Sequence, residues 1–432
     1  MKPAARIQAA IEVLEQILGH HQPAATALSD WGKAHRFAGS GDRSAIGNFV
    51  YDALRHRAFS AYHMRGDTPR ALVLGALHSA RGLDGAAIAA LCDGSQHAPP
   101  ALSADEATRL INGPHAGAAD WQLANIPQWL APALTRVFGA RLVAEGQAIA
   151  KRAPVDLRVN TLKATRDDVL EALAPHGAAA TAFSATGLRI APPAGDGRTP
   201  NVEAEAAHGR GWFEVQDEGS QVAAALTGAK PGDQVLDLCA GAGGKTLALA
   251  ALLKNTGKIH AYDSDKSRLR PIFERLTRAG ATHVEVMTAG DTAALDALKA
   301  RFDVVLVDAP CSGSGTWRRK PDAKWRLKAD VLAARIKDQQ AVLTRAGRLV
   351  KPGGRLVYVT CSLLAEENSD QIAHFVKTNS HYSALPWRQA WAQAMATPAP
   401  EHSADGRNDS LLLSPAMHGT DGFFIAVLTR AA

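Results

Sequence analysis

A predicted strand over residues 234–238 leads directly into a glycine-rich turn, which reads Asp237-Leu238-Cys239-Ala240-Gly241-Ala242-Gly243-Gly244-Lys245-Thr246. The apolar residues 247–253 that follow predict a helix. Glycines allow a tight turn and a close approach to a ligand, and the first turn of a helix offers free amide groups. Strand, turn and helix in this order predict a Rossmann-like unit that holds a nucleotide-like cofactor.

Two familiar phosphate-binding patterns do not fit this turn. A P-loop needs a glycine five residues before Gly244, where this chain has Cys239, and the dinucleotide pattern needs a glycine where Thr246 stands. Asp263 ends the next predicted strand, at a distance that suits a ribose, and Asp291 follows the third strand, where it suits an adenine edge. The combination favours S-adenosylmethionine over a nucleoside triphosphate. The alternative is that the glycines only pack a strand against a helix.

We therefore expect a cofactor site that is built from one turn and two carboxylates. Its predicted members are Cys239, Ala240, Gly241, Ala242, Gly243, Gly244, Lys245, Asp263 and Asp291.

Strands and helices alternate regularly on the C-terminal side of residue 216. Predicted strands at 234–238, 258–263, 283–287, 302–307, 354–360 and 422–428 indicate a mostly parallel sheet that is covered on both faces. The direction of the last strand stays open. Upstream, residues 42–59 and 68–92 have the apolar spacing of helices, and 97–104 resemble a linker. The predicted domains are an all-helical domain at 1–140, a small α+β domain at 150–215 and an α/β domain at 216–432.

The composition is that of a soluble globular protein. The 432 residues are 46% hydrophobic and 21% charged, and no run reaches the ~18 apolar residues of a membrane span. Four cysteines without a Cys-x-x-Cys pair argue against a disulfide framework and a zinc site, and they fit a reducing cytoplasm. The net charge of +6 favours a polyanionic partner, although a mildly basic enzyme would carry the same charge.

Two cysteines stand where predicted strands end. Cys311 follows Asp308-Ala309-Pro310, and Cys361 follows Thr360. Because ligands bind outside the carboxyl ends of parallel strands, both thiols should face the cofactor crevice. Burial without function is the default for either cysteine alone, but a pair at neighbouring strand ends favours covalent chemistry.

Between the cysteines lies a basic stretch, residues 317–328, with six basic residues and two tryptophans in twelve positions. Such a mixture suits phosphate contacts combined with base stacking. The predicted substrate-binding residues are Arg318, Arg319, Lys320, Lys324 and Trp325. The alternative is a solvated, basic start of a helix.

Methylation of a pyrimidine carbon would use all of these features. Carbon 5 of cytosine is a poor nucleophile until a thiolate adds to carbon 6. One thiol could add and the other could assist release, and the residues themselves do not decide between them. The target base must be unpaired or turned out of its helix to reach the thiol.

Together these residues resemble the Sun/NOL family of RNA cytosine-5 methyltransferases, above all the RsmB type that modifies small-subunit ribosomal RNA. The resemblance covers more than half the chain, and it rests on Arg158-Val159-Asn160-Thr161, the cofactor turn, Asp308-Ala309-Pro310-Cys311-Ser312, Thr360-Cys361-Ser362 with Glu366-Glu367-Asn368, and Asp421-Gly422-Phe423-Phe424. It implies a class I S-adenosylmethionine-dependent domain with a seven-stranded sheet and a NusB-like helical domain that binds RNA.

The resemblance also implies a role for each cysteine. Cys361 would be the nucleophile and Cys311 would help to release the product, while Asp308 would contact the flipped base and also belong to the cofactor-binding residues. One departure stands in the cofactor turn, because the family has Ala-Ala-Pro where this chain has Ala240-Gly241-Ala242. We expect a more flexible free turn and a surviving cofactor site.

The leading hypothesis is a cytoplasmic, monomeric RNA cytosine-5 methyltransferase that acts on 16S ribosomal RNA without a metal. A tRNA or DNA cytosine-5 methyltransferase is the second enzyme reading, and the DNA enzyme would place the nucleophile at Cys311. The third reading is a non-catalytic RNA-binding factor of ribosome assembly.

Overall fold

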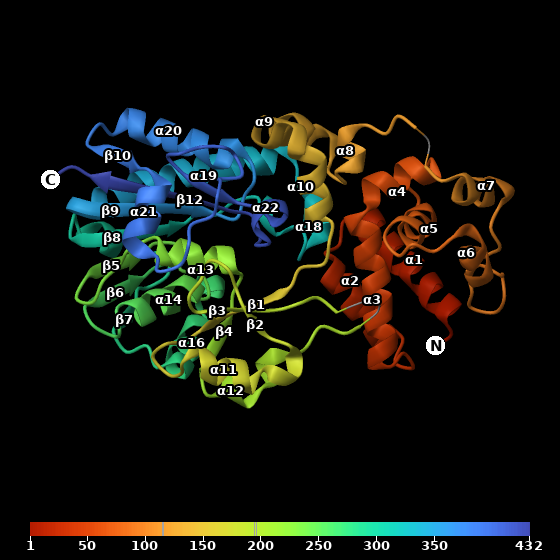
Figure 1. Cartoon of the computed structure of the whole chain (residues 1–432), viewed down its shortest axis with the longest axis horizontal. Helices are drawn as coiled ribbons and strands as arrows, with labels where there is room; N and C mark the ends of the chain where they lie inside the picture. The colour runs from red at the N-terminus through yellow and green to blue at the C-terminus, as the bar shows by residue number, and fades with distance from the viewer. Residues whose placement is uncertain (115, 194, 196) are drawn as a thin grey trace. The chain divides into compact units, whose positions relative to one another are not determined.

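The computed structural model describes residues 1–114, 116–193, 195 and 197–432, and it divides into two compact units (Figure 1). The first unit comprises Met1–Arg152, Pro193–Thr199 and Trp317–Leu327. The second unit comprises Ala153–Pro192, Pro200–Thr316 and Lys328–Ala432. The basic stretch therefore belongs to the N-terminal unit, although the chain on either side of it belongs to the second.

The described residues of the first unit form helices that are joined by loops and turns. They are α1 (Pro3–His20), α2 (Ala24–Ala34), α3 (Ser40–Arg55), α4 (Arg57–Met64), α5 (Pro69–Ser79), α6 (Gly85–Leu91), α7 (Ala104–Asn112), α8 (Asp120–Leu123), α9 (Ala131–Phe138), α10 (Leu142–Ile149) and α18 (Pro321–Arg326). Leu14, Ile46 and Leu72 from α1, α3 and α5 meet in a buried apolar core. The apolar spacing of these helices places their core faces together.

Two predicted helices are interrupted in this unit. The helix expected over 42–59 breaks at His56, between α3 and α4. The helix expected over 68–92 ends at Ser79, and Gly82 then takes a left-handed conformation with φ of 67°. Asp84 starts α6 by accepting a hydrogen bond from the amide of Ala87. A glycine turn followed by an N-cap stops one helix and starts the next.

A four-stranded antiparallel sheet forms the small α+β part of the second unit. Its order is β2-β3-β1-β4, with β1 (Val155–Val159), β2 (Ala179–Ala180), β3 (Gly187–Ile190) and β4 (Phe213–Val215), and α11 (Arg166–Ala172) and α12 (Ala206–Gly209) accompany it. Leu157, Leu188 and Phe213 are fully buried in its core.

The main sheet of the second unit has the order β10-β12-β9-β8-β5-β6-β7, and β11 pairs with β12 beside this path. Its strands are β5 (Gln234–Asp237), β6 (Lys258–Ala261), β7 (Val284–Val286), β8 (Phe302–Asp308), β9 (Val350–Thr360), β10 (Tyr382–Leu385), β11 (Leu411–Leu413) and β12 (Phe423–Arg430). The strands β7, β6, β5, β8 and β9 are parallel, whereas β12 is antiparallel to β9. This is the predicted mostly parallel, Rossmann-like sheet, and its last strand is antiparallel. The resemblance implied seven strands, and β11 adds an eighth by pairing with β12.

Helices cover both faces of this sheet. They are α13 (Glu218–Ala225), α14 (Gly244–Leu252), α15 (Lys266–Leu269), α16 (Ile272–Ala279), α17 (Thr292–Ala297), α19 (Ala329–Leu349), α20 (Ser369–Thr378), α21 (Trp387–Ala394) and α22 (Pro415–His418). Val304 and Leu306 of β8 pack with α13, α14 and α21 in one core cluster, while α19 packs on β8 and β9. Since side chains alternate along a strand, the apolar run 302–307 fills both layers. The carboxyl ends of β5, β6, β8 and β9 thus lie along one edge.

No helix in the described part of the chain is long and apolar enough to cross a membrane.

Candidate active site

The glycine turn between β5 and α14 has the backbone that its glycines predict. Gly241 and Gly243 have φ of 51° and 83°, in the left-handed region that favours glycine. A Cβ on Gly243 would lie 2.5 Å from Cγ1 of Ile272, so this position has no room for a side chain. The turn therefore holds its shape through glycine even where it departs from the family pattern at Gly241.

Two arginines outside the turn hold its carbonyl groups. Arg158 Nη1 of β1 donates to the Gly244 carbonyl at 2.7 Å, and Arg275 Nη1 of α16 donates to the Ala242 carbonyl at 2.8 Å. Arg275 also pairs with Glu214 of β4 at 2.9 Å. Burial lowers the pKa of Arg158 to about 10, which still leaves it charged at neutral pH. The small sheet thus fixes the cofactor turn through Arg158, a role that the motif Arg158-Val159-Asn160-Thr161 does not reveal in the sequence.

Of the two predicted cofactor carboxylates, Asp263 lies beside the turn, and its loop contacts the loop that carries Asp291. Asp263 Oδ2 accepts the Gly241 amide at 2.9 Å, and the Gly290 amide donates to the Asp263 carbonyl at 3.3 Å. Asp291 is exposed and caps α17 by accepting the Ala294 amide at 2.9 Å. Each carboxylate keeps further lone pairs for hydroxyl or amine donors.

A third carboxylate, Asp237, is fully buried below the turn. Its Oδ2 accepts the Thr246 hydroxyl at 2.7 Å, while Oδ1 has no hydrogen-bond partner. Burial raises the pKa of Asp237 to about 7. A buried acceptor without a donor is costly. A site that is rich in carboxylate acceptors suits a ligand with ammonium and hydroxyl donors, and S-adenosylmethionine carries both.

Lys245 connects the turn to the end of β8. Its Nζ lies 2.6 Å from Oδ2 of Asp308 and 5.3 Å from the centre of the Phe423 ring. The lysine is buried, but the side chain of Asp308 remains 34% exposed. Asp308 therefore has a fixed orientation and an open side for a ligand.

The two cysteines meet at the ends of β8 and β9. Cys311 Sγ and Cys361 Sγ are 3.4 Å apart, and both side chains are half-buried free thiols. The hydrogen bond with Cys361, together with burial, raises the pKa of Cys311 well above its usual range. The expected convergence of the two thiols is thus present, and Cys311 holds its proton at neutral pH.

A buried carboxylate, Glu367, ties together the loops that carry the cysteines. Its two oxygens accept the Ser312 amide at 2.7 Å, the Ser312 hydroxyl at 2.5 Å and the Ser362 hydroxyl at 2.5 Å. Gln339 of α19 donates to the same carboxylate at 3.1 Å. Ser312 follows Cys311 and Ser362 follows Cys361, so Glu367 joins the two loops that carry the thiols. The motif Thr360-Cys361-Ser362 with Glu366-Glu367-Asn368 does not by itself assign a role to Glu367, and the spacing of six residues from Cys361 is the one signal for it in the sequence.

The basic stretch has a different environment from the one expected. Arg318 and Lys324 are buried, Lys324 Nζ donates to the Arg55 carbonyl at 3.3 Å, and Trp325 Nε1 donates to the Leu54 carbonyl at 2.6 Å. These side chains pack within the helical unit, while Lys320 is exposed and Arg319 half-buried. Their contact with RNA stays a prediction, and Lys320 is the member best placed to test it.

Within residues 1–114, 116–193, 195 and 197–432, no group of three His, Cys, Asp or Glu side chains is arranged to hold a metal ion.

Two family models match this chain. The model of the 16S rRNA methyltransferases RsmB/F matches residues 224–429, and that of the RsmF/B-like ferredoxin-like domain matches residues 126–195. The first contains the cofactor turn and both cysteine loops, and the second contains β1, β2 and β3.

Individual relatives agree with these matches. A ribosomal RNA small subunit methyltransferase B of Sodalis glossinidius is 33% identical over 339 residues, which is 78% of this chain and 70% of the relative. A probable ribosomal RNA small subunit methyltransferase B of Synechocystis is 32% identical over 71% of this chain and 67% of its own length. The alignments thus span about two thirds of these relatives. The crystal structure of PH0851 is similar at a TM-score of 0.73 with 26% identity, and the match covers 100% of this chain and 99% of that one.

The matched segments carry the turn, the strand-end cysteines and the mostly parallel sheet, and the chain belongs to the RsmB/F family of methyltransferases.

Proposed function

We propose that this protein methylates carbon 5 of a cytosine in RNA, with 16S ribosomal RNA as the substrate and S-adenosylmethionine as the methyl donor. The single observation that carries the proposal is the 3.4 Å distance between the Cys311 and Cys361 sulfurs at neighbouring strand ends. Family membership supports the methyl transfer, and the names of the relatives support ribosomal RNA.

S-adenosylmethionine supplies an electrophilic methyl group on its sulfonium. Gly241, Gly243 and Asp263 would hold it at the turn, with Asp291 at the next loop. Arg158 and Arg275 keep that turn in place through its carbonyl groups. Asp308, oriented by Lys245 and partly exposed, would contact the flipped base.

Cys361 acts as the nucleophile in this proposal. Its thiolate forms a bond to carbon 6 of cytosine, and the electron pair that reaches carbon 5 makes that carbon nucleophilic. After carbon 5 has gained the methyl group, a general base takes the proton from carbon 5, the electron pair of that C–H bond restores the double bond between carbons 5 and 6, and the sulfur–carbon bond breaks to release the Cys361 thiolate.

Cys311 assists this last step. Because its raised pKa keeps it protonated, its S–H can donate a hydrogen bond to the sulfur of Cys361. A hydrogen bond stabilises the departing thiolate and so favours release of the methylated base.

The test compares Cys311→Ala with Cys361→Ala. Each variant is incubated with S-adenosylmethionine and small-subunit RNA, and denaturing gels are used to look for a protein–RNA adduct. Cys311→Ala should accumulate the adduct because release is impaired, and Cys361→Ala should form none. An adduct that survives the loss of Cys361 would contradict the assignment and favour attack by Cys311.

Cys92→Ala is the matched control, since Cys92 is a buried cysteine of the helical unit. It should turn over without accumulating an adduct. Bisulfite sequencing of RNA from cells with and without the gene then identifies the modified cytosine, and an unchanged 16S pattern would rule out that substrate.

A further inference from the structure

The two thiols at the ends of β8 and β9 are close enough to react with each other as well as with a substrate. Their sulfurs are 3.4 Å apart, and a disulfide joins two sulfurs at about 2.05 Å. The remaining approach of about 1.4 Å is within the reach of rotation about the Cα–Cβ bonds of the two cysteines. Among the four cysteines, all of which lie in the described part of the chain, Cys311 and Cys361 form the one thiol–thiol contact.

Backbone hydrogen bonds hold the two loops against each other on both sides of the thiols. Before the cysteines, the Ala309 amide donates to the Val359 carbonyl at 2.8 Å. Beyond Cys311, the Gly315 amide donates to the carbonyl of Cys361 itself at 2.9 Å. The two cysteines are 50 positions apart in the sequence, and folding covers the entropic cost of bringing them together. A bond between the sulfurs therefore needs only a local rotation.

Both thiols of the pair are accessible to a small oxidant. Each cysteine is half-buried, and the side chain of Asp308, at the end of β8, is 34% exposed. A cysteine that reacts as a nucleophile beside a second thiol is the usual arrangement of a reversible oxidation site, because the second thiol captures the oxidised sulfur.

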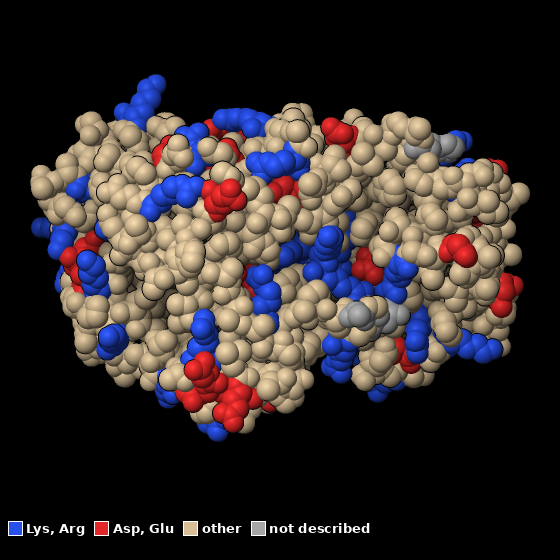
Figure 2. Space-filling model, in the orientation of Figure 1, with Lys and Arg blue, Asp and Glu red and all other residues tan. Residues whose placement is uncertain are grey.

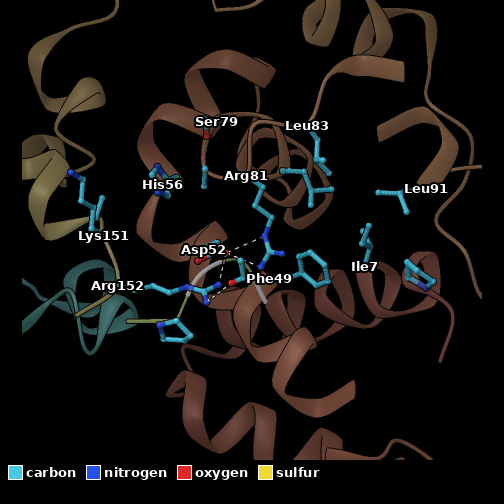
Figure 3. Close-up of a pocket in the computed structure, with 16 residues that line it drawn as sticks. Ile7, Phe49, Asp52, His56, Ser79, Arg81, Leu83, Leu91, Lys151 and Arg152 are labelled. Atoms are coloured by element: carbon cyan, nitrogen blue, oxygen red, sulfur yellow. Dashed lines mark hydrogen bonds and ion pairs between the residues drawn. The ribbon is translucent and has the colours of Figure 1, made fainter. Parts of the chain in front are cut away.

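The other two cysteines lack these properties. Cys92 follows Leu91, which lines a pocket of the helical unit (Figure 3), but Cys92 is 2% exposed and does not line that pocket. Burial and the carboxylates of Asp263 and Asp308 raise the pKa of Cys239, so its thiol stays protonated at neutral pH. Because oxidants react with the thiolate, conditions that oxidise the pair should spare both of these residues.

We propose that Cys311 and Cys361 form an oxidation site, at which a hydroperoxide converts the two thiols into a reversible disulfide that stops the methylation reaction. The disulfide would occupy both the nucleophile and the thiol that assists release. Its effect on methylation rests on the proposed function, whereas its formation does not. In a reducing compartment such a bond is transient, since other thiols reverse it by exchange.

The oxidation takes two steps. The Cys361 thiolate attacks one oxygen of hydrogen peroxide, a sulfur–oxygen bond forms, the oxygen–oxygen bond breaks, and the hydroxide that leaves takes up a proton to become water. The Cys311 sulfur then attacks the sulfenic acid at Cys361. The sulfur–sulfur bond forms, the sulfur–oxygen bond breaks, and the departing hydroxide leaves as water with the proton of Cys311. Two thiols are thus oxidised by two electrons, and one peroxide is reduced to two waters.

Cys311 is suited to the second step. The hydrogen bond with Cys361, together with burial, raises the pKa of Cys311. Oxidation of Cys361 to a neutral sulfenic acid removes the first of these causes, so the pKa of Cys311 falls and its sulfur becomes a better nucleophile. The order of the two steps follows from this difference.

The first experiment counts thiols in the intact chain, with hydrogen peroxide as the probe. Peroxide is small and uncharged, so its access does not depend on the Lys and Arg side chains that lie among Asp and Glu on the visible face (Figure 2). After denaturation in N-ethylmaleimide, the number of alkylated thiols should fall from four to two, and dithiothreitol should restore all four. Mass spectrometry should find Cys311 linked to Cys361. Four free thiols after peroxide, or a link through Cys92 or Cys239, would overturn the site.

The second experiment tests the order of the steps with dimedone, which reacts with sulfenic acids. In Cys311→Ser the sulfenic acid at Cys361 has no partner thiol, so this variant should gain dimedone at Cys361. Cys361→Ser should gain none. Dimedone on Cys311 in Cys361→Ser, with none in Cys311→Ser, would overturn the assignment of the attacking thiol.

The third experiment measures methyl transfer by the peroxide-treated protein. Turnover should be lost as the link forms and should return with dithiothreitol. The affinity for S-adenosylmethionine should not change, because Arg158 and Arg275 hold the cofactor turn without the thiols. Cys92→Ala is the matched control, and it should turn over, form the link and lose turnover like the parent.

The outcomes separate this oxidation site from the proposed function. If the reduced protein methylates RNA and peroxide produces no link, the oxidation site is wrong and the proposed function stands. If the link forms and turnover persists, the cysteine mechanism is wrong, and the effect of the disulfide on the reaction is wrong with it.

Discussion

The chain between β8 and α19 has two adjoining parts that belong to different units and have different environments. Residues 309–316 belong to the α/β unit, where Ser312 is held by Glu367 and Ser314 bonds the Ser362 hydroxyl at 3.1 Å. Residues 317–327 belong to the helical unit, where Lys324 and Trp325 donate to backbone carbonyls of α3. The first part places the Cys311 thiol beside that of Cys361, and the second packs a helix, α18, against α3.

The comparison teaches that residues adjacent in the sequence can belong to different structural units and have different environments. Conversely, Arg55, Arg81 and Arg152 come from separate segments of the helical unit, and each of them pairs with Asp52. A cation that is buried against a backbone carbonyl, as Lys324 is, packs one helix against another at a cost in desolvation.

The largest effect should come from Glu367→Gln, in the first part of the loop. The amide NH₂ of glutamine would face donors from Ser312, Ser362 and Gln339, so at least one hydrogen bond to a charged acceptor is lost, at about 1.5–3 kcal/mol. We expect turnover to fall at least about tenfold, with little change in S-adenosylmethionine affinity measured by calorimetry, because Glu367 does not contact the turn.

The control for this prediction is Glu366→Gln, at the neighbouring carboxylate, of which one oxygen accepts no hydrogen bond. It should retain near-normal turnover. Normal turnover in Glu367→Gln, or an equal loss in both variants, would show that Glu367 does not position the thiols.

A smaller effect, on stability, should come from Lys324→Met in the second part. Burial lowers the pKa of Lys324 to about 7 from its usual 10.5. Between these pH values the unfolded chain binds more protons than the folded one, so the stability of the parent protein rises with pH. Lys324→Met should be more stable at pH 6 by about 2–4 kcal/mol, and its advantage should shrink from pH 7 upward.

Urea denaturation of both proteins from pH 6 to pH 9.5 measures this difference. Lys320→Met, at an exposed lysine of the same stretch, should match the parent at every pH. A Lys324→Met variant that is less stable at pH 6 would show that the hydrogen bond to Arg55 outweighs the buried charge.

The smallest effect should come from Lys320→Ala, which tests the predicted RNA contact of the basic stretch. An exposed lysine that touches one phosphate contributes about 0.7 to the salt slope of single-strand binding. We expect a decrease of that size for Lys320→Ala and none for Lys324→Met, in anisotropy titrations with a short single-stranded oligoribonucleotide at several salt concentrations. If the salt slope decreased in Lys324→Met but not in Lys320→Ala, the buried lysine and not the exposed one would be the RNA contact.

Most of the fold and the core of the site could be predicted from local patterns. The alternation of strands and helices predicted a mostly parallel sheet, and β5, β8 and β9 are where the apolar runs placed them. Cys311 and Cys361 could be assigned to one site because they end strands of that sheet. The interruptions at His56 and after Ser79 were missed, since helical spacing continues across both breaks.

The sequence by itself determined the kind of sheet, the cofactor turn and the meeting of two thiols, because strand period, glycine and strand ends act over a few residues and parallel strands share one edge. The tertiary structure alone decided which charges are buried. Glu367 between the cysteine loops, Arg158 on the cofactor turn, Lys324 against α3 and the arginines around Asp52 all depend on contacts between distant segments. Burial and pairing are properties of those contacts, so local composition carries no record of them.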